Sequence, residues 1–128
     1  MKPELTWLLF AVVLTFGHVL VATIGAQLQV GLATLAANRE KMVEFKGWAG
    51  RAQRAHRNML ENMVLFVPLV LIAVVAGKTN ATTLMGAQIF VLARLVYALV
   101  YFAGVPWLRT GVWLVSVVGL VMIALQLL

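Results

Sequence analysis

Four long apolar stretches, separated by short polar segments, dominate the pattern of this chain, and each predicts a membrane-spanning helix. The stretches cover approximately residues 5–35, 51–76, 82–102 and 109–128. A spanning helix needs about 20 residues, and every stretch provides them if the second begins near Arg51. The segment 103–108 contains Gly104 and Pro106, which favour a break between helices. We therefore predict an all-α integral membrane protein in which one domain of four transmembrane helices occupies residues 1–128.

The composition agrees with this interpretation and narrows the possible chemistry. Hydrophobic residues make up 63% of the chain and charged residues only 11%, which is typical of a membrane protein. The net charge of +6 does not indicate nucleic acid, because the basic residues gather around one loop and its flanks. The absence of cysteine excludes disulfides, thiolate nucleophiles and iron–sulfur clusters. His18 and His56 lie far apart, so no metal-ligand spacing is present.

The distribution of basic residues predicts the orientation in the membrane. Six Lys or Arg side chains belong to the first connection and the start of the second helix: Arg39, Lys41, Lys46, Arg51, Arg54 and Arg57. Arg109 adds a seventh at the third connection, whereas the opposite side has only Lys2 and Lys78. We expect the first and third connections in the cytoplasm, both termini outside, and a bacterial inner membrane as the location.

The start of the second helix has an organised polar face. At about 100° per residue, five polar side chains share an arc of roughly 100°. They are Arg51, Arg54, Asn58, Glu61 and Asn62. His56 and Arg57 fall outside this arc. Arginine matches carboxylates, glutamate accepts from an ammonium group, and asparagine both donates and accepts, so the face suits a zwitterionic, peptide-like ligand.

Two structural interpretations compete with a binding site. Basic side chains at a helix end often extend to lipid headgroups, and this applies best to Arg57 and Arg51. A network between Arg54 and Glu61 inside the membrane would instead hold the bundle together. Glu61 argues against the headgroup interpretation, because it lies a turn deeper than Asn58 and gains nothing from anionic lipids.

The third helix supplies a second group of polar side chains. Arg94, Tyr97 and Tyr101 have spacings of three and four residues and share one face. Either tyrosine alone is typical of the aromatic belt at a membrane interface. Together with an arginine inside the span, they indicate the lining of a site. Arg109 opens the fourth helix on the side where the polar face of the second helix lies.

These residues resemble the MAPEG superfamily, the membrane-associated proteins in eicosanoid and glutathione metabolism, in a bacterial type of member. The resemblance rests on the second-helix pattern from Arg51 to Asn62, on Ala93–Tyr101, and on the turn that runs from Gly104 to Thr110. It covers essentially the whole chain. The Arg-Ala-x-x-Asn-x-x-Glu core, from Arg54 to Glu61, is specific within a four-helix chain of this length.

The resemblance implies a homotrimer that binds glutathione as co-substrate between protomers and acts on a lipophilic molecule from the membrane. By match, Arg54, Asn58 and Glu61 hold the peptide, His56 lies nearby and Arg51 belongs to the same motif. Arg94, Tyr97 and Tyr101 match pocket-lining residues. Arg109 resembles the arginine beside the glutathione sulfur, and Thr110 occupies the place of a serine implicated in catalysis. A membrane glutathione transferase or peroxidase, with its active site on the cytoplasmic side, is the function this implies.

The chain departs from the family pattern in two places. The segment Gln27–Gly31 lacks the basic residue that many glutathione-using members carry there, and Asn62 replaces a tyrosine found in some members. A non-catalytic lipid-binding or scaffold protein on the same fold is therefore the alternative function. A small exporter of cationic drugs is a weaker alternative, because Glu61 lies among arginines and not alone in the middle of a span.

Overall fold

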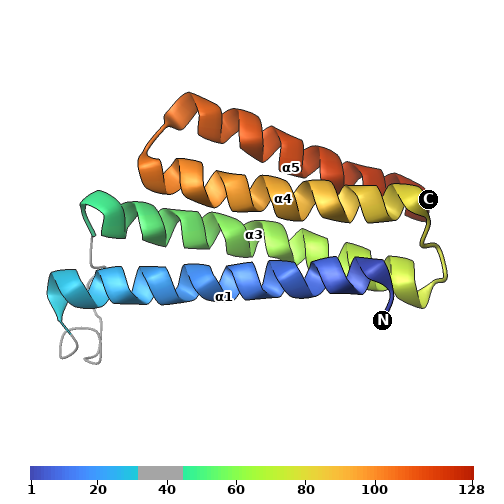
Figure 1. The fold of residues 1–128 in the computed structure, drawn as a ribbon, viewed down its shortest axis with the longest axis horizontal. Helices are drawn as coiled ribbons and strands as arrows, with labels where there is room; N and C mark the ends of the chain where they lie inside the picture. The colour runs from blue at the N-terminus through green and yellow to red at the C-terminus, as the bar shows by residue number, and fades with distance from the viewer. Residues whose placement is uncertain (32–44) are drawn as a thin grey trace.

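In the part of the chain that the structure describes, four helices lie side by side, and each runs antiparallel to the one before it (Figure 1). The computed structural model describes residues 1–31 and 45–128. Within these ranges the helices are α1 (Pro3–Val30), α3 (Gly47–Val75), α4 (Ala81–Ala103) and α5 (Pro106–Leu127). Each is long and apolar enough to cross a membrane. The prediction of an all-α integral membrane protein with four spanning helices is confirmed.

The helix boundaries differ from the expected ones around the first connection. Helix α1 ends at Val30, where Gly31 adopts a φ of 81° that suits glycine and stops the helix. Helix α3 begins at Gly47, before the polar face. The Gln29 side-chain amide pairs with the backbone of Lys46: Gln29 Nε2 donates to the Lys46 carbonyl oxygen, and Lys46 N donates to Gln29 Oε1 at 2.9 Å. The predicted extension of the first helix over residues 32–35 and the basic residues Arg39 and Lys41 lie outside the described residues.

The other boundaries follow local sequence signals. The Asn80 side chain accepts a hydrogen bond from Thr83 N, and the Thr83 hydroxyl accepts one from Asn80 N, which forms a capping box for α4. Gly104, in the left-handed region with φ 81°, ends α4. Pro106 is the first residue of α5. An N–H at this position would have no intrahelical acceptor, so proline costs the helix no hydrogen bond there. The tight turn at Gly104 brings the start of α5 next to the end of α4.

Helices α4 and α5 approach closely because glycines face each other. A methyl group on Gly119 would lie 2.6 Å from the Gly86 carbonyl oxygen, and one on Gly86 would lie 2.7 Å from the Gly119 carbonyl oxygen. Small residues at such contacts let backbones pack closely in membranes, where lipid tails weaken the hydrophobic drive for association. This contact aligns α5 along α4.

The core between α3, α4 and α5 is apolar and tightly packed. Phe66 of α3 and Phe90 of α4 stack with ring centroids 4.1 Å apart, and both are fully buried. At the end away from the first connection, the Thr83 hydroxyl donates to the buried carboxylate of Glu4 at 3.1 Å, which ties α1 to α4. The core therefore holds the helices in one arrangement from the middle of the bundle to this end.

The glycine contact predicts a position-specific effect on stability. Replacing Gly119 by alanine forces α4 and α5 apart and lowers the free energy of unfolding by about 1–3 kcal/mol. Gly111→Ala is the matched control on the same helix, because a methyl group there meets nothing within 4 Å. Thermal unfolding of both variants in detergent measures the difference. Equal midpoints for the two variants would contradict this account of α4–α5 packing.

Candidate functional site

A polar pocket of about 280 Å³ lies near the end of the bundle where α3 begins and α4 ends. Three helices form it, and its lining is almost entirely polar or charged. The lining residues are Arg54, Arg57, Asn58 and Glu61 of α3, Tyr97 and Tyr101 of α4, and Arg109 of α5. The two tyrosines are buried, whereas Arg54, Arg57 and Glu61 are exposed. The pocket thus has an aromatic floor and a charged rim.

Tyr101 joins the three helices at this pocket. Its hydroxyl accepts a hydrogen bond from Arg54 Nε at 3.1 Å, and the guanidinium carbon of Arg109 lies 4.8 Å from its ring centroid. The second contact has the geometry of a cation–π interaction. One phenol side chain therefore positions an arginine from α3 and another from α5 on the same pocket.

Tyr97 forms the deeper part of the floor and rests on Arg94. The Arg94 guanidinium carbon lies 4.1 Å from the Tyr97 ring centroid, and the rings of Tyr97 and Tyr101 are tilted with centroids 5.6 Å apart. Arg94 is fully buried, and none of its three guanidinium nitrogens has a hydrogen-bond partner in the described part of the chain. Arg94 thus supports the floor of the pocket from below.

The α3 wall is ordered by an asparagine pair. The Asn62 side-chain amide is buried and donates to the Asn58 carbonyl oxygen at 2.8 Å and to Asn58 Oδ1 at 3.2 Å. This leaves the Nδ2 donors of Asn58 for the pocket, next to the carboxylate of Glu61 one turn away. The wall therefore offers donors and an acceptor side by side.

The structure brings together six of the predicted site residues and leaves four outside the pocket lining. The six are Arg54, Asn58, Glu61, Tyr97, Tyr101 and Arg109. The four are Arg51, His56, Arg94 and Thr110. Arg51 Nε donates to the Phe102 carbonyl oxygen at 3.0 Å, and the exposed Thr110 hydroxyl donates to the Pro106 carbonyl oxygen at 3.3 Å.

His56 does not line the pocket, because its side chain lies on a different face of α3. Its Nδ1 is buried and has no partner among residues 1–31 and 45–128. Arg57, which the polar arc excluded, does line the pocket. Its spacing of four residues from Glu61 was the signal for it, because such residues are neighbours on a helix surface. The predicted polar face of α3 was centred too close to Arg51. The side of α3 that contacts α4 forms the pocket wall, and this side includes Arg57 and Glu61.

The charges that line the pocket are complementary to those of a ligand that carries both signs of charge with an excess of negative charge. Its three arginines and one glutamate give a formal net charge of +2. Arginine binds carboxylates through paired N–H donors, and a carboxylate accepts from ammonium groups. The aromatic floor excludes water from one side and strengthens these interactions.

Four apolar helices long enough to span a membrane, with a basic pocket near one end of the bundle, define a small integral membrane protein. The chain matches the MAPEG family over residues 5–128, and it belongs to this family. The resemblance stated from the sequence is therefore confirmed.

One named protein is similar to part of the chain. Microsomal glutathione S-transferase 1 of Mus musculus is 35% identical over 74 residues, which cover 58% of this chain and 48% of the mouse protein. The chain thus matches about half of that relative's length. No solved structure matches the chain significantly.

The role of Tyr101 is open to a direct test. Tyr101→Phe removes the hydrogen bond from Arg54 while keeping the ring beneath Arg109, and we expect a loss of about 1 kcal/mol in stability. Tyr97→Phe is the control, because Tyr97 contacts Arg94 through its ring and the substitution leaves that contact in place. Denaturation of both variants in the same detergent gives the comparison. A larger loss for Tyr97→Phe would show that Tyr101 does not hold this end of the bundle.

Proposed function

We propose that this protein is a membrane glutathione-dependent transferase or peroxidase that acts on lipophilic electrophiles or hydroperoxides. The observation that carries the proposal is the pocket in which three arginines, Glu61 and Asn58 surround two tyrosines. Family membership and the mouse relative support glutathione as the ligand.

The charges of glutathione match those of the pocket. The peptide has two carboxylates and one ammonium group, and its thiolate adds a further negative charge. Arg54 and Arg57 are placed to bind the carboxylates, Glu61 to accept from the ammonium group, and Asn58 to donate to a peptide or carboxylate oxygen. The pocket charge of +2 is balanced only when the sulfur is a thiolate, so the site favours the reactive form.

Arg109 is the residue proposed to stabilise the sulfur. A free thiol has a pKa of about 8.5 and is mostly protonated at neutral pH. Arg109 is held over Tyr101, on the side of the pocket nearest the start of α5, where a cation beside the sulfur lowers that pKa. The Thr110 hydroxyl donates to the Pro106 carbonyl oxygen, so it can contact the ligand only when that hydrogen bond is broken.

The reaction then needs no metal or cysteine. In transfer, the thiolate sulfur attacks an electrophilic carbon, a C–S bond forms, and the electron pair moves to the leaving group or into the acceptor. In peroxide reduction, the thiolate sulfur attacks the terminal oxygen of the hydroperoxide, an S–O bond forms and the O–O bond breaks, and protonation releases the alcohol. A second glutathione then converts the glutathione sulfenic acid to glutathione disulfide and water. The acceptor arrives from the hydrocarbon phase beside the helices.

The proposal includes a homotrimer whose neighbouring protomer completes the site, and a cytoplasmic location of the pocket. The rim side chains Arg54, Arg57 and Glu61 are exposed on α3, which suits a ligand held between protomers. Lys46, Arg51, Arg54, Arg57 and Arg109 lie at the pocket end of the bundle. Lys2 and Lys78 lie at the other end, so the positive-inside rule supports the proposed cytoplasmic location of the pocket.

Arg109→Leu tests the role at the sulfur. We expect thiolate absorbance of bound glutathione to disappear and turnover of a model electrophile to fall by about 100-fold or more. Lys78→Ala, at the opposite end of the bundle, removes one positive charge and leaves both readouts unchanged. Thiolate absorbance that persists in the Arg109 variant would remove this arginine from the mechanism.

Glu61→Gln separates the enzyme from the non-catalytic scaffold. Because Glu61 is exposed at the pocket rim, the enzyme hypothesis expects glutathione affinity to fall by roughly tenfold with unchanged thermal stability. A purely structural network predicts the reverse, a loss of stability without a change in affinity. Calorimetric titration with glutathione and thermal unfolding of the same preparation distinguish the two.

A further inference from the structure

A second cavity lies between α1, α3 and α4, on the other side of the α3–α4 wall from the polar pocket. It has a volume of about 400 Å³, within the range of small-molecule sites. Its lining is Leu14, Gly17, His18 and Val21 of α1, Ala52 and Ala55 of α3, and Leu95, Ala98, Leu99 and Phe102 of α4. On α4, this face is rotated by roughly 130° from the face of Tyr97 and Tyr101. The two sites are therefore separate.

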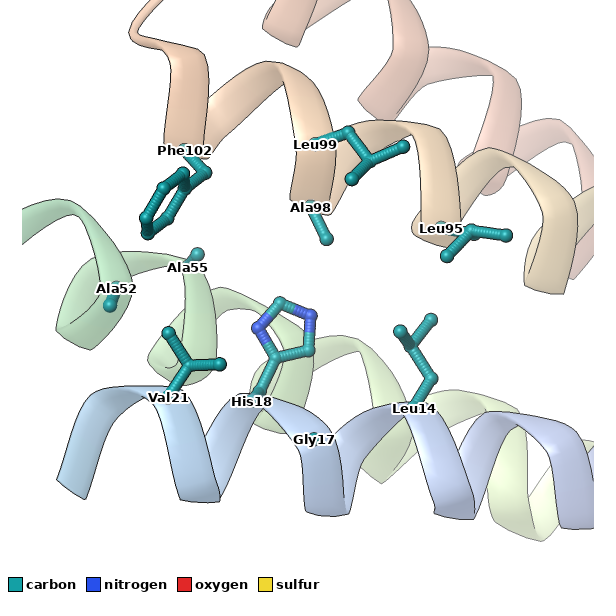
Figure 2. A pocket seen from close by; sticks show the side chains of 10 residues that line it. All are labelled: Leu14, Gly17, His18, Val21, Ala52, Ala55, Leu95, Ala98, Leu99 and Phe102. Carbon is teal, nitrogen blue, oxygen red and sulfur yellow. The ribbon is translucent and has the colours of Figure 1, made fainter. Parts of the chain in front are cut away.

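Small side chains create this cavity. The lining positions on α1 and on α4 each follow the spacing of three and four residues that places side chains on one helix face. Gly17, Ala52, Ala55 and Ala98 do not fill the space between the helices (Figure 2). Val21, Leu95 and Phe102 are 41–46% exposed and Leu99 is 67% exposed, so the cavity opens toward the hydrocarbon layer.

One polar side chain interrupts the apolar lining. The His18 imidazole projects from α1 into the cavity, surrounded by Leu14, Val21, Ala55 and Ala98 (Figure 2). His18 is only 9% exposed, and its Nε2 is buried without a hydrogen-bond partner in the described ranges 1–31 and 45–128. A buried imidazole nitrogen without a partner is unfavourable, so it favours a ligand that supplies the missing hydrogen bond.

We propose that this cavity binds one molecule of a lipophilic alcohol, with its hydrocarbon chain along the α1–α4 groove and its hydroxyl on His18 Nε2. His18 lies about midway along α1, so the oxygen of the ligand is deep in the hydrocarbon layer. A phospholipid does not meet this condition, because its charged headgroup stays at the membrane surface. A hydroxyl both donates and accepts, so it pairs with either tautomer of a neutral imidazole.

The shape of the cavity agrees with a single chain. The lining runs from Leu14 to Val21 on α1 and from Leu95 to Phe102 on α4, about 10 Å along each helix. This is about a third of the hydrocarbon thickness of a bilayer. The cavity therefore holds a segment of one chain around its hydroxyl and does not enclose a two-chain lipid.

The test uses the full chain in phosphatidylcholine nanodiscs and a medium-chain secondary alcohol that carries a diazirine. We expect photolabelling on α1 and α4 at the cavity. An unlabelled secondary alcohol should compete about tenfold better than the alkane of the same length, a factor that corresponds to one hydrogen bond. His18→Leu should remove this preference. Thr23→Leu, which replaces an exposed polar residue of α1 outside the cavity, should retain it.

Gly17→Leu provides an independent variant. A Cβ at Gly17 meets nothing within 4 Å, so the larger side chain enters the cavity without a clash at its base and should block the labelling. Equal competition by alcohol and alkane, or labelling that survives Gly17→Leu, would overturn the proposal. Absence of labelling in the unsubstituted protein would also overturn it, by showing that protein covers the groove.

Discussion

The close approach of α4 and α5 at Gly86 and Gly119 is the contact on which the candidate site depends. Lipid tails compete with apolar side chains for every helix surface, so backbone proximity and packing must hold these helices together. Once α5 lies along α4, the turn at Gly104 and Pro106 places Arg109 over the ring of Tyr101.

Polar groups in this bundle are divided between two sites with different physical characters. The pocket at the end of the bundle has a buried aromatic floor and an exposed charged rim, which suits a hydrophilic ligand that arrives from water. The cavity around His18 is apolar, opens to lipid and has one unpaired nitrogen. Helices α3 and α4 form a common wall between them. A protein with both sites is suited to bring a water-soluble and a lipid-soluble molecule to one bundle without mixing their environments.

Helical periodicity predicted much of the polar pocket. Spacings of three and four residues placed Arg54, Asn58 and Glu61 on one face of α3 and the tyrosines on one face of α4, and these residues do line one pocket. The same reasoning failed for Arg57 and Arg51. A helical wheel gives the angles between side chains on one helix. Which of those side chains line a pocket depends on the side from which a neighbouring helix packs. Arg94 shares a face with Tyr97, yet it is buried beneath the ring and does not line the pocket.

The amino-acid sequence alone was enough to predict a four-helix membrane protein of the MAPEG type, because apolar length and motif spacing are local properties of the chain. It also determined the end at which positive charge gathers. The packing of the helices was needed to show that Tyr101 joins Arg54 to Arg109 across three helices, and that His18 faces an open cavity. These contacts depend on how closely helices approach and how they are rotated. That geometry results from the combined packing of residues far apart in the chain, such as Gly86 with Gly119 and Phe66 with Phe90.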